Sequence, residues 1–277
     1  MIEAAPAKIN LALHVRRRMA DGYHALETIF AFAEEGDLLR AEAAERLSLT
    51  IGGPFSAGLE ADESNLVLRA ARALGEALGF APALAFHLDK RLPIASGIGG
   101  GSADAAAALR LLARWRGVDP ADPRVAAVAA GLGADVPACL HGATVRGEAR
   151  GDALYPIASE RLSGLPLLLV NPRLPLATGP VFKAWDGIDR GALAVGDPFD
   201  AALAGRNDLQ PPAIALLPAI ATVLDSLAAQ RDVLLARMSG SGATCFALFG
   251  SIEARDAADR ALADMRPEWW RLATRLR

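Results

Sequence analysis

The 277-residue chain is poor in the residues that build disulfide-rich or zinc-bound folds. It has two cysteines, Cys139 and Cys245, and four histidines. Two cysteines are too few for a disulfide scaffold, and no CxxC pair or Cys/His spacing matches a zinc site. His14, His87 and His141 fit no ligand spacing either. The sequence therefore assigns no residue as a metal ligand, and we expect both cysteines to be small buried residues.

Long apolar runs and an excess of basic charge are also absent. The run LPLLLV at 165–170 is far too short for a bilayer, which needs about 18 apolar residues in succession. The amino-terminal residues lack the charged region, apolar run and cleavage site of a secretory signal. A net charge of −3 provides no basic field for nucleic acid or an anionic membrane. We therefore expect a cytoplasmic protein with no nucleic-acid and no membrane partner.

What is present is an ordinary globular composition, 52% hydrophobic and 22% charged, which allows one large or two smaller cores. Alternating or continuous apolar patterns predict strands at 7–15, 24–32, 47–51, 82–93 and 165–172. Helical spacing predicts helices at 64–79 (with Ser64 as a possible N-cap), 102–115 and 122–133, the last opened by Asp122 and Pro123. Toward the end, the sequence predicts a helix at 218–230, two strands at 233–250 around a Gly/Ser loop, a helix at 251–265 and a strand at 269–274. The pattern restarts near residue 155, so we expect a two-lobed α/β (α+β) protein with domains 1–155 and 156–277.

Four of the five residues from 97 to 101 are glycine, in the stretch LPIASGIGGGSADAA. Glycine carries a high backbone-entropy cost, so a feature of the fold or a ligand must need the bare backbone. Successive N–H groups in such a turn form an anion site, and the following helix adds its positive end. Ser102 can cap that helix. Phosphate is the natural ligand; the structural alternative is a tight turn that packs against a neighbouring backbone.

Two common phosphate loops do not match this stretch. The loop of P-loop nucleoside triphosphatases ends in GK[ST], and no lysine follows the glycines here. The dinucleotide fingerprint begins like Gly97-Ile98-Gly99, but it requires a second strand and an acidic residue about 20 residues on. The chain runs through a helix into RWRGVDP instead. A dehydrogenase is therefore disfavoured.

The stretch PIASGIGGGSADAA resembles the phosphate loop of the GHMP kinase superfamily, and SGSGATCFAL at 239–248 resembles its C-terminal glycine motif. The resemblance implies an N-terminal ribosomal-protein-S5-domain-2-like nucleotide lobe and a C-terminal ferredoxin-like lobe. It also implies the ATP-binding residues, namely Asn65, Leu66, Pro93, Ile94, Ala95, Ser96, Gly97, Ile98, Gly99, Gly100, Gly101, Ser102 and Ala103.

Three further stretches, 6–30, 133–142 and 176–182, resemble the family of 4-diphosphocytidyl-2-C-methyl-D-erythritol kinases, and AKINL followed by DGYH is the most specific part. The family implies ATP-dependent phosphorylation of the substrate's 2-hydroxyl, in the non-mevalonate route to isoprenoid (terpenoid) precursors. It implies a phosphotransferase acting on a cytidine-diphosphate-linked small molecule, with ATP as co-substrate and Mg²⁺ expected. The sequence leaves a monomer and a homodimer both open.

The same resemblance assigns catalytic roles to Lys8 and Asp135, with Asp135 as general base or as an orienting group for the hydroxyl. On local sequence alone, Asp135 is a turn residue at a helix end, with Pro137 preventing a new helix, and Lys8 is an exposed strand lysine. The substrate-binding residues implied are Asn10, Tyr23, His24, Thr178, Phe182, Gly240, Ser241 and Gly242. Tyr23 and Phe182 are expected to sandwich the cytosine ring while His24 hydrogen-bonds its edge. Lys90, before the loop, could reach a nucleotide, although a solvated strand-end lysine is the simpler expectation.

Three alternatives remain open at this stage. Another kinase of the superfamily, for mevalonate or homoserine, has no use for the base sandwich of DGYH and Phe182. A catalytically silent nucleotide-binding homologue would have lost Lys8 or Asp135, and both are present. A ribosome-associated module of related fold would need a basic surface, which the net charge does not supply.

Overall fold

The computed structural model describes residues 1–277 and contains both helices and strands throughout. The strands are β1 (Ile2–Arg18), β2 (His24–Ala43), β3 (Ser48–Gly52), β4 (Leu84–Asp89), β5 (Val145–Glu148), β6 (Ala153–Pro156), β7 (Pro166–Asn171), β8 (Val233–Met238), β9 (Cys245–Phe249) and β10 (Trp270–Arg275). The helices are α1 (Leu66–Leu78), α2 (Gly100–Trp115), α3 (Pro123–Leu132), α4 (Val136–His141), α5 (Thr178–Lys183), α6 (Pro198–Ala204), α7 (Gln210–Leu216), α8 (Ala219–Ala228) and α9 (Ile252–Met265). The α/β prediction is confirmed.

The chain forms two compact units that interleave along the sequence. The first unit comprises 1–7, 35–94 and 99–142, and the second comprises 8–34, 95–98 and 143–277. The long strands β1 and β2 therefore contribute to both units. The sequence predicts consecutive domains that meet at residue 155, and that boundary stays a prediction.

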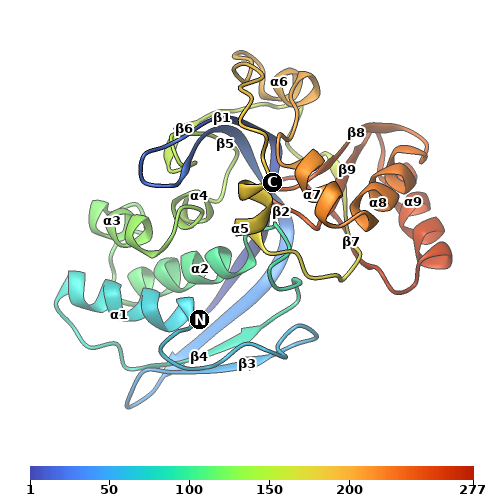
Figure 1. Ribbon diagram of the computed structural model, residues 1–277. Helices are drawn as coiled ribbons and strands as arrows, with labels where there is room; N and C mark the ends of the chain where they lie inside the picture. The colour runs from blue at the N-terminus through green and yellow to red at the C-terminus, as the bar shows by residue number, and fades with distance from the viewer. The chain divides into compact units, whose positions relative to one another are not determined.

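The first unit pairs strands with a layer of helices. The later part of β2 is antiparallel to β4, with Leu38 opposite Asp89, and β3 runs parallel to β4. Helix α2 packs against α1 and α4, and α1 also contacts α3 (Figure 1). Residues 103–109 of α2 are all buried, which explains the alanine run, since small side chains allow neighbouring helices to approach closely.

The helix ends of the first unit correct three sequence predictions. Asn65, and not Ser64, caps α1 by accepting the amide of Val67 at 3.0 Å. Ser102 does not cap α2, because the helix already begins at Gly100. Pro137 does not prevent a helix: it lies in the first turn of α4, where proline costs no hydrogen bond. Asp122 caps α3 as predicted.

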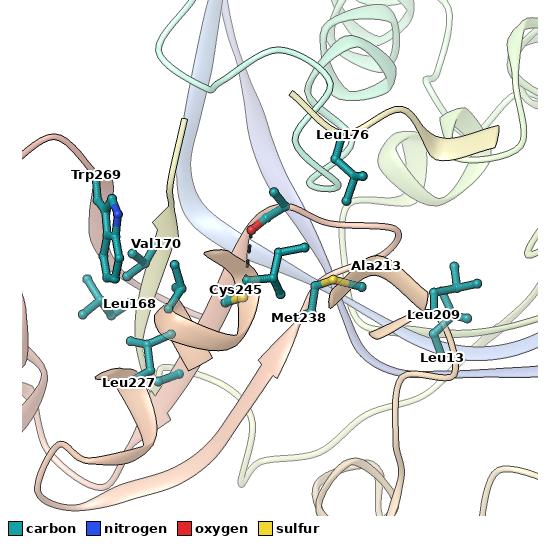
Figure 2. Packing of buried hydrophobic residues seen from close by; sticks show 14 of the residues in the cluster. Leu13, Leu168, Val170, Leu176, Leu209, Ala213, Leu227, Met238, Cys245 and Trp269 are labelled. Atoms are coloured by element: carbon teal, nitrogen blue, oxygen red, sulfur yellow. Dashed lines mark hydrogen bonds between the residues drawn. The ribbon is translucent and has the colours of Figure 1, made fainter. Parts of the chain in front are cut away.

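The second unit contains an antiparallel sheet in the order β10-β7-β9-β8. The early part of β2 pairs with β5, and β5 pairs with β6. Helices α8 and α9 cover the β7–β9 region, so their apolar faces close a large core. Figure 2 shows Cys245 among the apolar side chains of this core, with its thiol beside the Ala243 carbonyl. Burial raises the pKa of this thiol, and both cysteines are buried, as predicted.

Six elements were not predicted as separate units: β5, β6, α4, α5, α6 and α7. Each has seven residues or fewer, too short for a clear periodic pattern. No helix is both long and apolar enough to cross a bilayer.

Candidate functional site

Two glycine loops meet in the second unit. Gly97 has φ +79°, and a Cβ there would lie 2.6 Å from the carbonyl oxygens of both Ser239 and Gly242. The Ser239 hydroxyl donates to the Gly97 carbonyl at 3.0 Å. Gly97 is therefore required by close backbone packing, the structural alternative raised for this loop, and the contact fixes one glycine loop against the other.

Lys8 and Asn10 lie on β1 next to this junction. Both side chains are buried, so Lys8 is not the exposed lysine that its local sequence suggests. The Lys8 ammonium donates to the Asn10 Oδ1 at 3.1 Å and lies 5.0 Å from the centre of the Phe30 ring. The backbone N–H of Asn10 donates to the Ser239 hydroxyl at 3.2 Å. A buried cation is thus held beside the loops by a fixed polar partner and an aromatic ring.

Thr28 and Asn207, which sequence analysis did not single out, hold this arrangement in place. Asn10 Nδ2 donates to the Thr28 hydroxyl at 2.8 Å. Asn207 Nδ2 donates to the carbonyls of Met238 and Gly240, both at 2.8 Å. Only the structure identifies these roles, because each residue acts on a segment distant in sequence.

Thr178 begins α5, and its hydroxyl shares a 2.9 Å hydrogen bond with that of Ser241. The structure therefore brings Thr178 together with Ser241 of the loop Gly240–Gly242, and their assignment to substrate stays a prediction. Gly240 and Gly242 are buried, and both have positive φ.

Tyr23 lies at the turn before β2 with 55% of its surface exposed. The Arg150 guanidinium lies 4.5 Å from the centre of its ring, and Arg150 is itself held by an ion pair with Asp21. A cation over one ring face orients the tyrosine while leaving most of it accessible.

His24, the next residue, belongs to a cluster of aromatic rings. Its ring lies 5.0 Å from that of Phe182 and meets the edge of Trp185 at 5.7 Å. Burial, with a smaller contribution from Arg18, lowers the pKa of His24 below its usual 6.5, so the ring is neutral at pH 7. Its Nε2 is buried with no hydrogen-bond partner. The predicted pair of His24 and Phe182 is therefore brought together, and the role of His24 toward cytosine stays a prediction.

Trp185 was missed by sequence analysis. It follows α5 by two residues and is 3% exposed. Arg18 Nη2 donates to the carbonyls of Lys183 and Trp185, at 3.0 and 3.3 Å, and so ties the end of α5 to β1 within this unit. One tryptophan after a short helix carries no sequence pattern that could have indicated this contact.

In the first unit, the other glycines of the run, Gly99–Gly101, form the start of α2. Gly99 is left-handed with φ +64°, and its carbonyl accepts the amide of Ala103 at 2.8 Å. A Cβ on the exposed Gly101 would meet only Leu66 Cδ1, at 3.6 Å, an ordinary contact. The fold therefore has room for a side chain at 101, so that packing does not require glycine there. Leu66, assigned to the adenine pocket, is next to this helix start.

Lys90 is not the solvated lysine expected from its place at a strand end. It is 2% exposed and forms ion pairs with Asp37 and, at 2.6 Å, with Asp104. Asp37 also accepts the amides of Arg91 and Leu92, at 2.6 and 2.8 Å. This cluster fixes the segment that leads into the glycine run to the first turns of α2.

The second carboxylate oxygen of Asp104 has no partner, although it is buried. Burial, opposed by the Lys90 ammonium and reinforced by the nearby Asp37, raises the pKa of Asp104 to about 7. Asp104 therefore acts here as a buried structural carboxyl.

Asp135 belongs to the first unit, half-buried at the residue that precedes α4. Its side chain caps no helix amide. The carboxylate is thus not used as an N-cap, the ordinary structural use of aspartate at such a position.

Two family descriptions match the chain. Residues 65–143 match "GHMP kinases N terminal domain" and residues 196–271 match "GHMP kinases C terminal". The first range contains α1, the glycine-bearing start of α2 and Asp135; the second contains the loop Ser239–Gly242.

Curated relatives match over nearly the whole length. A 4-diphosphocytidyl-2-C-methyl-D-erythritol kinase of Rhizorhabdus wittichii is 65% identical over 99% of this chain and 94% of its own. The enzyme of the same name from Cereibacter sphaeroides (strain KD131) is 50% identical over 98% and 97%.

Solved structures agree in fold. The crystal structure of a 4-(cytidine 5'-diphospho)-2C-methyl-D-erythritol kinase aligns with a TM-score of 0.77 and 33% identity, covering 100% of this chain and 99% of that one. A mevalonate kinase from Methanococcus jannaschii aligns at 0.72 with 13% identity, covering 100% and 98%, a likeness of fold alone. With both GHMP descriptions matched and full-length relatives at 50–65% identity, this chain belongs to the 4-diphosphocytidyl-2-C-methyl-D-erythritol kinase family of the GHMP kinases.

Proposed function

We propose that this chain transfers the γ-phosphoryl group of ATP to the 2-hydroxyl of 4-diphosphocytidyl-2-C-methyl-D-erythritol, giving the 2-phosphate and ADP. The observation that carries the proposal is the full-length likeness to relatives of that name. The neutral His24 ring beside Phe182, with a free Nε2, supports it further. A kinase for mevalonate or homoserine would have no base to place there.

ATP is proposed to bind through residues 93–103 with Asn65 and Leu66. The support is the open backbone at Gly101 next to Leu66, and the positive end of α2. The cytosine is proposed to stack on Tyr23 and Phe182 and to bond His24, with Asn10, Thr178 and Gly240–Gly242 holding the rest of the substrate.

For catalysis we propose that Asp135 accepts the proton of the attacking hydroxyl or orients it, and that Lys8 stabilises the charge on the transferring phosphoryl. Support for Lys8 is its burial and fixed position beside the glycine loops. Support for Asp135 is its place within the matched GHMP kinases N terminal domain.

Mg²⁺ is expected with ATP. No three acidic, histidine or cysteine side chains gather to form a cation site. Mg²⁺ keeps several waters and binds substrate phosphates with few protein ligands, so we expect the ion to arrive with the nucleotide and assign it no residue. We further propose a cytoplasmic location, and leave open whether the protein is a monomer or a homodimer.

The test is ADP release from Mg·ATP with three acceptors in parallel: 4-diphosphocytidyl-methylerythritol, methylerythritol phosphate without cytidine, and mevalonate. Turnover with the first alone supports the proposal. Turnover with mevalonate would refute the substrate assignment, and no turnover despite ATP binding would indicate a silent homologue.

The same assay with Asp135→Asn tests the catalytic assignment. We expect kcat to fall by about a hundredfold or more, the usual contribution of a positioned base, while substrate binding stays measurable. A variant with near-normal kcat would show that the proton is taken elsewhere.

A further inference from the structure

The second unit contains a pocket of about 530 Å³ to which no role has been assigned above. Its walls come from three segments, 184–190, 205–212 and 236–237. None of the residues assigned to ATP, substrate or catalysis lines it. The volume falls within the range of roughly 300–1,000 Å³ typical of small-molecule sites.

The charged residues of the pocket leave one positive charge without a carboxylate. Arg190 pairs with Asp186 through Nη2 and Oδ2 at 2.5 Å, and Arg206 pairs with Asp208 through Nε and Oδ1 at 2.7 Å. Arg237 is the third lining cation and has no acidic partner. The wall therefore carries a formal charge of +1, from three arginines and two aspartates.

Arg237 is buried, with 8% of its surface exposed. Its guanidinium donates to three backbone carbonyls, those of Leu11, Ala202 (2.7 Å) and Gly205 (2.6 Å). Burial lowers the pKa of Arg237 to about 10, which leaves it charged at neutral pH. Carbonyl dipoles stabilise a buried cation less well than a counter-ion does, so a bound anion would be favoured here.

Trp185 provides a probe of the pocket, because it lines the wall that also contains Arg237. Its indole nitrogen is buried and has no hydrogen-bond partner, so the N–H itself does not face the pocket. A ligand beside the residue would nevertheless change the surroundings of its ring.

We propose that this pocket binds a small metabolite bearing a phosphate or carboxylate group, which pairs with Arg237 beside the Trp185 side chain. The alternative is a purely structural role, in which Arg237 only joins β8 to the end of α6 and the backbone of β1. The two differ in one respect: only a site responds to anions.

Because the Trp185 ring also contacts that of His24, an occupied pocket would adjoin the ring cluster of the proposed cytosine site. The pocket proposal does not depend on the kinase activity. It concerns binding alone and can be tested whether or not the substrate assignment is correct.

The experiment follows the indole N–H resonances of the four tryptophans in ¹H–¹⁵N spectra of the full chain, with Trp185→Phe used to assign Trp185. Inorganic phosphate and malonate are titrated in separate arms, with ADP present to occupy the glycine loop and chloride at matched ionic strength as control. We expect a saturable shift of the Trp185 resonance, with phosphate if the ligand is a phosphate ester and with malonate if it is a carboxylate. No shift with either anion, or an equal shift with chloride, would overturn the proposal.

Substitutions of the lining arginines test which positive charge binds the anion. Arg237→Met should weaken anion binding by about tenfold or more, since a charged hydrogen-bonding partner is lost, whereas Arg237→Lys should retain part of the affinity. If Arg237→Met does not fold, Arg206→Gln serves in its place, because it leaves Asp208 unpaired and repelling the anion. Arg161→Gln, an exposed arginine outside the pocket, is the matched control. A folded Arg237→Met or Arg206→Gln protein with unchanged affinity would refute the assignment.

Discussion

Tyr23 is held by a charged neighbour while more than half of its surface stays accessible. Arg150 covers its ring at 4.5 Å, and Asp21 fixes Arg150. Fixing the ring before a base arrives lowers the entropy lost when the base stacks. We therefore predict that Tyr23 serves binding and not packing at the edge of the core.

Tyr23→Ala should raise the KM for the cytidine substrate by roughly fivefold to a hundredfold, the equivalent of about 1–3 kcal/mol for one stacked base, with little change in kcat. Steady-state kinetics with the substrate varied at saturating ATP would measure this. Tyr155→Ala is the control, because Tyr155 is the other tyrosine of the chain and is 52% exposed. Equal effects of the two substitutions would contradict the base-stacking role.

Asp104 makes the stability of the fold depend on pH. Its pKa rises from 3.8 to about 7 on folding, mainly through burial. Between these values the folded state binds a proton that the unfolded state does not. The free energy of unfolding contributed by this group is therefore present below about pH 4 and is lost as pH rises toward 7.

We expect Asp104→Asn to remove most of this dependence, because the amide cannot titrate and Lys90 keeps Asp37 as its partner. Denaturant unfolding from pH 5 to 8 would show a flatter profile for the variant. Asp264→Asn, at an exposed position of α9, is the control and should follow the unsubstituted protein. If Asp104→Asn retains the full slope, another group carries the dependence.

At the scale of elements, the glycine run serves two purposes in one stretch of five residues. Gly97 is needed because the loop Ser239–Gly242 packs against its backbone. Gly101 has no such neighbour, so packing does not explain its missing side chain. We therefore predict that phosphate binding, the other use that the sequence allows for this run, depends on Gly101 and not on Gly97.

A pair of alanine substitutions separates these purposes. Gly97→Ala should lower thermal stability, because a Cβ would lie 2.6 Å from two carbonyl oxygens and φ is +79°. Gly101→Ala should leave stability nearly unchanged and weaken ATP binding. Thermal unfolding and calorimetric titration of nucleotide would measure both effects. A Gly101→Ala protein with full affinity for ATP would place the phosphates elsewhere.

The elements that sequence predicted correctly are those with long periodic patterns, such as α1, α9 and the strand at 166–171. The glycine loops and the pair of His24 and Phe182 also followed from sequence, through resemblance to a family. Sequence did not predict the short helix α5, the buried ion pairs of Lys90 or the contacts of Trp185. They depend on residues brought together from distant parts of the chain, which no local pattern encodes.

Because the two units of the molecule interleave along the sequence, no single break in the chain separates one from the other. Leu13 and Val15 of β1 belong to the hydrophobic core formed by the sheet β10-β7-β9-β8 and its helices. The backbone of Leu13 also pairs with the 206–208 segment, through hydrogen bonds of 2.8 and 2.9 Å. A fragment that begins at 156 would lack this strand and expose the surface that it covers.

We therefore expect residues 156–277, the C-terminal domain that the sequence suggests, not to fold on their own. The fragment would lose the apolar contacts of Leu13 and Val15 and leave Arg237 without the Leu11 carbonyl, so that a buried charge loses one of its three acceptors. Far-UV circular dichroism and the dispersion of amide resonances, compared with those of the full chain, would measure this. Co-expression with residues 1–155 should restore folding, because it returns β1 and β2. A fragment that unfolds cooperatively by itself would instead establish residue 155 as a true domain boundary and would mean that the contribution of β1 to this core is dispensable.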